Sequence, residues 1–513
     1  MIVVGSGATG TVAARRLALS GLRVLVCEAG SAVANDDRAA LVRLQPPSNA
    51  SRQQPVQSRL PGFSPRIAPF LVDDTEHPYV VDSSGMDFAW LRSRGLGGRT
   101  LLWGGVCPRL APINFTEGRH DGRSPEWPIA LPDLEPHYAV VEGLLGVSDA
   151  VADAGSVPPL TAAESCFADV VVRRWPDRRV QRSRGIAGPA HRRDRSGGTW
   201  PAGALVPHLQ DLIAQSKVSV RTDSAVASLS LDGDRVVGVH VVDRCTLEVR
   251  EERAEAIVLA ASTIETARIL LNSRSPEHPG GVGQSSGWLG RGLMDHPALT
   301  VTGRVPGAIV QAHDGPPGGA RGLSIPRFRN TPESGDTVGF VRGYQVWGHA
   351  ARATASDGTA SFMMAASGEM LPNPENRVTL HETAVDALGL PVPVIRFAYG
   401  HNERALMADA QMEVTAMCTA AGFVIDRVDR HDLSIGTYIH EVGTARMGRD
   451  PANSVVDPWN RVWDAPNVLV VDGACWPTSA HQNPTLTMMA LADRACAALV
   501  DRSPSGAPRA NPR

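Results

Sequence analysis

The first 28 positions alternate between apolar runs and glycine-rich or polar breaks in the order strand, turn, helix, strand. The run "IVVG" precedes the turn "SGATG", and "TVAARRLALSG", which reads as a helix closed by Gly21, precedes the run "RVLVCE". These lengths and breaks predict a β-α-β unit at the start of the chain.

Further patterns follow along the chain. Residues 218–261 predict an antiparallel insertion that contains "VASLSL", "RVVGVHVV" and "LEVREE" and ends in the buried strand "AIVLAA". Helices are expected in "TIETARILLNS" and "NERALMADAQMEVTAMCTAA", strands in "SFMMAAS", "VPVIRFAY" and "NVLVVDG", and a last helix up to about Val500. The segment from about 40 to 70, rich in Pro, Ser and Gln, predicts an irregular loop.

The chain of 513 residues is too long for one ordinary core, so two interleaved domains are expected. The predicted fold class is α/β (α+β overall): a Rossmann-like nucleotide-binding domain interleaved with a substrate domain built on an antiparallel sheet. The nucleotide-binding segments are expected at 1–150, with a loop or lid at about 40–75, at 206–300 and at 436–500. The substrate-domain segments are expected at 151–205 and 301–435, and a disordered tail at 501–513.

Composition narrows the class of protein. The formal net charge of −3 indicates neither a nucleic-acid partner nor an anionic membrane surface. The seven cysteines are odd in number and nowhere spaced as CxxC, so neither a disulfide framework nor a metal site is expected. The sequence has neither an apolar stretch of about 18 residues nor a cleavable signal pattern, which predicts a cytoplasmic protein.

Gly5, Gly7 and Gly10 form a GxGxxG motif directly between the first predicted strand and its helix. Such glycines let the backbone approach a pyrophosphate that binds at the helix N-terminus. Glu28 ends the second predicted strand, where a carboxylate accepts hydrogen bonds from a ribose diol and repels a 2′-phosphate. The motif therefore predicts a site for the ADP moiety of a cofactor, and both NAD and FAD stay open.

Four further segments, in the order of the chain, resemble those of the glucose-methanol-choline (GMC) flavoprotein oxidoreductases. They are "RGLGGRTLLWGG" at 94–105, "AASTIETARILLNS" at 260–273, "LGRGLMDHP" at 289–297, and the pair "HEVGTARMG" at 440–448 with "VVDGACWPTSAHQNPTLTMMALA" at 470–492. The second segment departs from the family pattern, with Ala261 where glycine is common. The resemblance extends over nearly the whole chain, and its C-terminal pair is specific.

The resemblance implies FAD as the cofactor, with a substrate domain over the flavin face. Besides contacts from Gly5, Gly7, Gly10 and Glu28, the resemblance implies cofactor contacts from Gly97, Gly98, Thr100, Asp472, Gly473, Pro484 and Thr485. Many relatives attach the flavin to a histidine of the glycine-rich loop, but this chain has Leu102 at the matching place. Non-covalent FAD is therefore expected.

Asn483 has two interpretations. It precedes Pro484 and an apolar helical run, which is the arrangement of an N-cap residue with proline at N1. Relatives, however, place a His or Asn here, opposite the histidine of an HxxGT motif, to bind the substrate oxygen. The resemblance thus implies a catalytic pair of Asn483 with His440, while Glu441 either orients that histidine or pairs with an arginine.

The remaining polar and aromatic residues near these motifs are expected to play supporting roles. His481 is expected in a loop or beside the flavin, and His296 in a structural role. Trp103 and Trp476 either pack against the flavin or belong to the core.

The resemblance implies oxidation of an alcohol: His440 takes the hydroxyl proton, Asn483 donates to the oxygen, and flavin N5 receives the hydride. Residues 127–138 and 371–380 look most like the bacterial sugar-oxidising branch related to pyranose oxidases and glycoside 3-oxidases. The expected substrate is a small alcohol such as a sugar, a glycoside or an aminocyclitol-like compound.

Three reaction types stay open. The electron acceptor is either O₂, as in an oxidase, or a quinone-like carrier, as in a dehydrogenase that acts on a simpler alcohol. The third type is a FAD-containing lyase of the same fold. An enzyme that depends on NAD is disfavoured by the resemblance.

Overall fold

The structure is a computed structural model that describes residues 1–32, 71–101, 103–148, 160–186, 192–193, 199–200, 205–307, 309, 322–332, 338–354, 360–430 and 435–501. The loop predicted from about 40 to 70, Leu102 and residues 502–513 of the predicted tail lie outside these ranges. Within them, no helix is both long and apolar enough to cross a bilayer.

The β-α-β unit predicted at the start of the chain is confirmed. Strand β1 (Ile2–Val4) pairs in parallel with β2 (Val24–Cys27), and helix α1 (Ala8–Leu19) connects the two. They belong to a six-stranded sheet of order β21-β22-β13-β1-β2-β9, in which the edge strand β21 pairs antiparallel and the others pair in parallel. The other strands are β9 (Val218–Arg221), β13 (Ile257–Leu259), β21 (Arg461–Val462) and β22 (Ala465–Val470).

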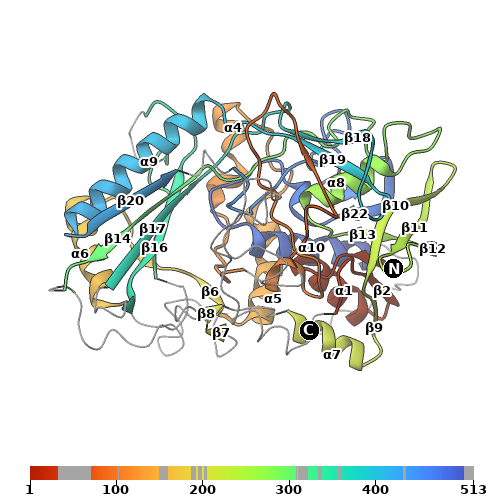
Figure 1. The fold of residues 1–513 in the computed structure, drawn as a ribbon, viewed down its shortest axis with the longest axis horizontal. Coiled ribbons are helices and arrows are strands. Elements are labelled where there is room, and N and C mark those ends of the chain that lie inside the picture. Colours follow the sequence, from red (N-terminus) through yellow and green to blue (C-terminus); the bar gives the residue numbers. More distant parts are fainter. Residues whose placement is uncertain are drawn as a thin grey trace.

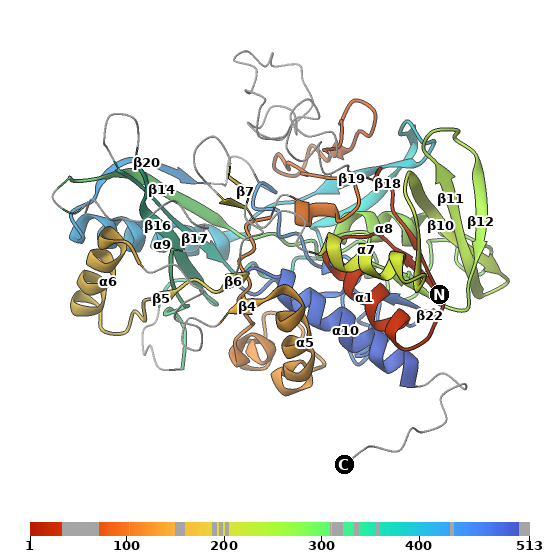
Figure 2. The ribbon, with the colours of Figure 1, turned by 90° about the horizontal axis from the view of Figure 1, so that it is seen from below.

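Helices pack around this parallel sheet, and two of them confirm predicted helices. Helix α8 (Thr263–Asn272) follows β13, and α10 (Thr485–Asp501) lies beside α1 (Figure 2). Helix α5 (Glu135–Leu145) packs against α10, and α7 (Val206–Ala214) against α1. The N-terminal ends of α1 and α10 thereby come to the same side of the sheet as the carboxyl ends of the parallel strands.

The antiparallel insertion is confirmed for most of its predicted length. It consists of β10 (Ser224–Asp232), β11 (Arg235–Asp243) and β12 (Val249–Arg253). Residues 218–221 and the last strand of the segment were wrongly included, because they form β9 and β13, which pair in parallel within the first sheet. A four-residue alternating strand carries too little pattern to indicate which of two neighbouring sheets it joins.

A second six-stranded sheet lies at the other end of the molecule (Figure 1) and has the order β20-β14-β17-β16-β15-β5. All its pairs are antiparallel. Its strands are β5 (Gln181–Arg182), β14 (Ala298–Val305), β15 (Leu323–Ile325), β16 (Tyr344–Thr354), β17 (Ala360–Gly368) and β20 (Val424–Arg430). Helices α6 (Ala162–Arg174) and α9 (His401–Ala420) pack against it, so the predicted strand "SFMMAAS" and the long predicted helix are confirmed.

The expected substrate segment 301–435 contributes to two hydrophobic cores. Val301, Met364 and Val414 belong to the core under the antiparallel sheet, whereas Ile395 belongs to the core of the parallel sheet. Ile395 lies on β19 (Pro391–Arg396), which pairs with β18 (Arg377–Val385) and β3 (Val80–Val81). The chain therefore passes between the two halves more often than the three nucleotide-binding and two substrate-domain segments describe.

Short elements connect these layers. They are η1 (Gly98–Leu101), η2 (Pro112–Phe115), α4 (Glu117–Asp121), η3 (Leu131–Asp133), β4 (Val147–Ser148), β6 (Gly185–Ile186), β7 (Arg192–Arg193), β8 (Thr199–Trp200) and η5 (Gly473–Cys475).

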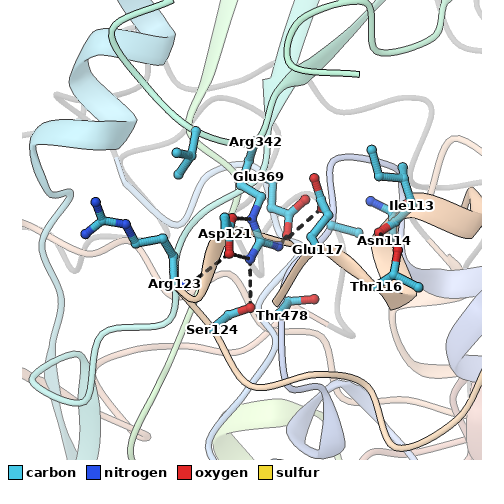
Figure 3. Close-up of polar contacts among 12 residues, drawn as sticks. Ile113, Asn114, Thr116, Glu117, Asp121, Arg123, Ser124, Arg342, Glu369 and Thr478 are labelled. Atoms are coloured by element: carbon cyan, nitrogen blue, oxygen red, sulfur yellow. Dashed lines mark hydrogen bonds and ion pairs between the residues drawn. The ribbon is translucent and has the colours of Figure 1, made fainter. Parts of the chain in front are cut away.

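A buried ion cluster joins helix α4 to the antiparallel sheet (Figure 3). The Arg342 guanidinium donates to Asp121 Oδ2 (2.6 Å) and Glu369 Oε1 (2.7 Å), and it also contacts Glu117, which pairs with Arg327. Burial, together with repulsion from Glu117, raises the pKa of Glu369 well above its usual range. Arg342 and Arg327 thus supply two positive charges to a cluster of three carboxyl groups, and burial favours the protonated form of Glu369.

We predict that Arg342→Met lowers the free energy of unfolding by about 3–5 kcal/mol, because it leaves buried carboxylates without their cation. The matched control is Arg304→Met, since Arg304 pairs with Asp426 on the surface with both side chains exposed. An exposed pair contributes about 0–1 kcal/mol. Denaturant titration of both variants measures the difference, and equal losses would contradict a stabilising role for the cluster.

Candidate active site

A cavity of about 380 Å³ lies at the carboxyl ends of the parallel strands. Residues that directly follow four neighbouring strands line it: Gly5 after β1, Glu28 after β2, Ala260 after β13 and, one residue further on, Asp472 after β22. Ligands of parallel α/β sheets bind in this position because loops and helix N-termini meet there. The cavity is therefore the candidate site for the cofactor.

The three glycines of the GxGxxG motif differ in function. Gly5 has φ +95°, in the left-handed region that favours glycine, and Gly7 has no atom within 4 Å of the place that a Cβ would take. Both line the cavity. Gly10 does not line the cavity. A Cβ at this position would lie 1.9 Å from the carbonyl oxygen of Gly5, so this glycine permits the close packing of α1 on the turn.

Ser6, which the sequence did not single out, connects three segments around the cavity. Its backbone N–H and its hydroxyl both donate to Glu28 Oε2, at 2.9 and 2.6 Å, and its Oγ accepts from the N–H of Gly97 at 3.0 Å. Gly97 itself does not line the cavity, whereas Glu28, Gly98 and Thr100 do. Ser6 thereby fixes the predicted ribose-binding carboxylate against the second glycine-rich loop.

The C-terminal motif forms another side of the cavity, where Asp472, Gly473, Pro484 and Thr485 lie as expected. The Asp472 carboxylate accepts from Ser262 N at 2.9 Å and from Thr266 Oγ1 at 2.6 Å, which joins the end of β22 to the start of α8. The predicted cofactor residues thus gather around one cavity, except for Gly10 and Gly97, which support its walls.

The structure brings His440 and Asn483 together. Asn483 Nδ2 lies 3.4 Å from His440 Nε2, although the residues come from different loops. His440 lines the cavity, whereas Asn483 is not among the lining residues. The N-cap interpretation of Asn483 does not hold, because α10 begins at Thr485 and the carbonyl of Pro484 accepts its first bond, from Met488 N at 3.0 Å.

Burial dominates the electrostatics around His440. It lowers the pKa of the His440 imidazole well below the ordinary 6.5, with smaller contributions in the same direction from His296 and Arg99. The ring of His296 packs edge to face on that of His440, with centroids 5.1 Å apart, and its Nδ1 bonds to the carbonyl of Gly368. The structural role expected for His296 thus agrees with its contacts, and His440 is a neutral imidazole at pH 7.

Asp295 is a further buried group that the sequence did not single out. Its Oδ1 accepts from the backbone N–H groups of His440 (3.1 Å) and His296 (2.9 Å). Burial, with repulsion from Glu441 as the second cause, raises the pKa of Asp295 to about 8. A neutral carboxyl group therefore holds the backbone of His440.

The open question about Glu441 is answered in favour of an arginine. Glu441 Oε2 accepts from Arg99 Nη1 at 2.6 Å, and Arg99 Nη2 donates to Ser262 Oγ at 2.8 Å. Arg99 lines the cavity, and its role was not visible in the sequence because the chain is rich in arginine. His481 is a buried loop residue whose Nδ1 lies 3.4 Å from Asn114 Nδ2.

The two tryptophans have different positions. Trp103 lines the cavity, so it is placed to pack against a bound cofactor. Trp476 is fully buried and contacts the ring of Trp127, with centroids 5.2 Å apart. It belongs to the core.

Comparison with known proteins agrees with this geometry. The family profile described as GMC oxidoreductase matches residues 372–492. The chain is 30% identical to 6'''-hydroxyparomomycin C oxidase of Streptomyces lividus, over 97% of this chain and 90% of that protein. It is 29% identical to 2-methyl-1,2-propanediol dehydrogenase of Mycolicibacterium austroafricanum, over 78% of this chain and 79% of that protein. The crystal structure of pyridoxine 4-oxidase from Mesorbium loti superposes with a TM-score of 0.61 over 97% of this chain and 98% of that chain, at 19% identity.

The chain belongs to the GMC oxidoreductase family. Its members are FAD-binding oxidoreductases that act on alcohol groups, so FAD is the cofactor and the chain is an enzyme of this class. The cavity fits this cofactor, because Gly7 leaves open space at the N-terminus of α1 and Glu28 offers a carboxylate at the end of β2.

We predict that Gly7→Ala and Gly10→Ala separate cofactor binding from folding. A Cβ at position 7 enters the space of the cofactor, so FAD is expected to bind at least tenfold more weakly while the apoprotein keeps its melting temperature to within a few degrees. A Cβ at position 10 collides with the backbone of Gly5, so the apoprotein itself should lose stability. Flavin fluorescence titration and thermal unfolding measure the two effects, and the opposite pattern would contradict the assigned roles.

Proposed function

We propose that the protein oxidises one CH–OH group of a polyhydroxylated small molecule, such as a sugar, a glycoside or an aminocyclitol-like compound. The carrying observation is the contact between His440 Nε2 and Asn483 Nδ2, 3.4 Å apart at the cavity. The relative from Streptomyces lividus, named for the oxidation of an aminoglycoside, supports the substrate class.

The two side chains divide the work on the substrate hydroxyl. With the NH₂ group of Asn483 toward His440, Nε2 is the ring nitrogen that accepts, which corresponds to the tautomer with its proton at Nδ1. A hydroxyl oxygen that enters between them accepts from Asn483 Nδ2 and gives its proton to His440 Nε2. General-base help of this kind contributes about 10²–10⁴-fold to a rate.

The loops around the cavity hold the cofactor in this proposal. Gly5, Gly7 and Glu28 bind the ADP moiety, and Asp472 with the N-terminus of α10 lies near the flavin. FAD supplies the acceptor for the two electrons that leave the alcohol carbon. The cofactor is non-covalent, because residues 99–104 contain no histidine that could carry it.

Two electron acceptors stay in the proposal, O₂ and a quinone-like carrier. The name of the Streptomyces lividus relative is that of an oxidase, and the name of the Mycolicibacterium relative is that of a dehydrogenase. Release of peroxide by the reduced enzyme in air distinguishes the oxidase from the dehydrogenase, since a quinone-dependent enzyme reoxidises slowly until a quinone is added.

The function is tested by anaerobic titration of the purified yellow protein with sugars, glycosides, aminocyclitols and simple diols. We expect loss of flavin absorbance with at least one polyhydroxylated compound, and an at least 10²-fold slower loss in His440→Ala with FAD still bound. His240→Ala, on β11 away from the cavity, is the matched control. If His440→Ala reduces its flavin at the wild-type rate, the assignment of the base is wrong.

We predict that reduction of the flavin keeps its rate from neutral pH down to below pH 6.5. The neutral imidazole takes the proton, and burial lowers the pKa of His440 well below 6.5, so the active form persists where an exposed histidine is already half protonated. The rate should fall only at more acidic pH. Anaerobic stopped-flow reduction from pH 4.5 to 8 measures this profile, and a half-point at or above 6.5 would contradict it.

A further inference from the structure

A chain of hydrogen bonds runs from the antiparallel sheet to the candidate catalytic pair. Ser367 Oγ donates to the carbonyl of His481 at 3.2 Å, and Gln345 Nε2 contacts Ser367 Oγ at 3.1 Å and Asn483 Oδ1 at 3.4 Å. Asn483 Nδ2 then faces His440 Nε2. Ser367 is fully buried and Gln345 is 7% exposed, so water does not compete freely for these bonds.

The carbonyl at the start of this chain fixes the direction of every bond. A carbonyl oxygen only accepts, so the Ser367 hydroxyl gives its proton to His481 and must accept from Gln345. Gln345 therefore presents its NH₂ group, whose second proton points to Asn483 Oδ1. The amide of Asn483 is thereby oriented with its oxygen toward Gln345 and its NH₂ group toward His440.

This orientation matters because the two ends of an asparagine amide have nearly the same shape and opposite hydrogen-bonding roles. With the amide inverted, Oδ1 would face both the lone pair of His440 Nε2 and the substrate oxygen. Oδ1 can only accept, from the substrate hydroxyl or from an Nε2–H tautomer of His440, so no donor would face the substrate oxygen and the base would lose its free lone pair. A group that donates to Asn483 Oδ1 excludes that inverted state.

We infer that Gln345 is a positioning residue of the reaction: through its contact with Asn483 Oδ1 it holds the Asn483 amide with the NH₂ group toward the substrate oxygen. Gln345 lies on β16, directly opposite Ser367 on β17. Gln345 does not line the cavity, so at this position the antiparallel sheet acts on the reaction through Asn483. The inference rests on the proposed function of Asn483.

The test is a double-mutant cycle on the FAD-loaded enzyme, with the rate constant of anaerobic flavin reduction at saturating substrate as the readout. Gln345→Leu is expected to slow reduction by about 10- to 100-fold, less than the 10²–10³-fold typical of removing a donor that contacts the reacting oxygen. The FAD dissociation constant should stay at the wild-type value, whereas the melting temperature should fall somewhat, because Asn483 Oδ1 and Ser367 Oγ each lose a buried donor. Gln215→Leu, the same substitution at the end of α7, is the matched control.

The double variant Gln345→Leu/Asn483→Ala should react as fast as Asn483→Ala alone, because Gln345 acts through Asn483. An additive loss, or a wild-type rate in Gln345→Leu, overturns the inference. A wild-type rate in Asn483→Ala overturns the proposed function instead, so the two failures are distinguishable.

If Gln345→Leu does not fold, Gln345→Glu takes its place in the test, because it keeps the shape of the side chain. At a pH high enough to ionise the introduced carboxyl group, whose pKa burial raises, the carboxylate has no proton to offer Asn483 Oδ1, so the amide should invert and the rate should fall at least as far as in Gln345→Leu. Retention of the wild-type rate in this variant also overturns the inference.

Discussion

The hydroxyl of Ser6 holds three separated segments of the chain together at the cofactor cavity, since it donates to Glu28 and accepts from the N–H of Gly97. Ser6 and Glu28 are buried. A buried polar group without a partner costs about 1–3 kcal/mol, so residues 6, 28 and 97 must take their places together. The cavity therefore exists only in the assembled fold, and the same dependence joins Asp472 to Ser262 and Thr266 on its other side.

Burial also sets the protonation states that the proposed chemistry needs. The neutral imidazole of His440 accepts from Asn483, so the hydrogen bond and the low pKa favour the same form. Asp295, beneath the backbone of His440, is neutral at pH 7 because burial raises its pKa to about 8. An ionised carboxylate in that place would raise the pKa of His440, so less of the imidazole would be in the neutral form that accepts a proton at neutral pH.

The sequence predicts the parts of the fold whose patterns are local. Three such parts are the glycine turn between β1 and α1, the buried strand β13 and the helix α8. Each is identified by its own apolar pattern or turn residues, without knowledge of the segments that pack against it. Strand β9 was placed in the wrong sheet because four alternating residues do not specify a partner. The boundaries between the domains were likewise hard to place, since segments such as β19 pack in a core far from their neighbours in sequence.

The residues of the site likewise divide into those that a sequence pattern indicates and those that only the folded structure brings together. His440 and Asn483 could be paired only through the resemblance to a family, because the local pattern of Asn483 fits an N-cap equally well. Of the partners of these two residues, Asp295 lies within the segment 289–297 that resembles the family but was not singled out there, and Gln345 has no local signal. They act through individual hydrogen bonds that form when distant strands and loops meet. The sequence around a glutamine in a strand does not indicate which hydrogen bond its side chain will form.

The two halves of the molecule meet where their exact placement affects the reacting groups. Gln345 and Ser367 belong to the antiparallel sheet, and the carbonyl of Gly368, next in the chain, accepts from His296, whose ring packs on His440. Glu369 follows directly and bonds to Arg342 in the ion cluster with Asp121 of helix α4. A shift of one half against the other would therefore strain the ion cluster as well as the contact of Gln345 with Asn483. A buried cluster of paired charges resists such a shift more strongly than apolar contacts do, because separating its charges leaves each one desolvated and unpaired.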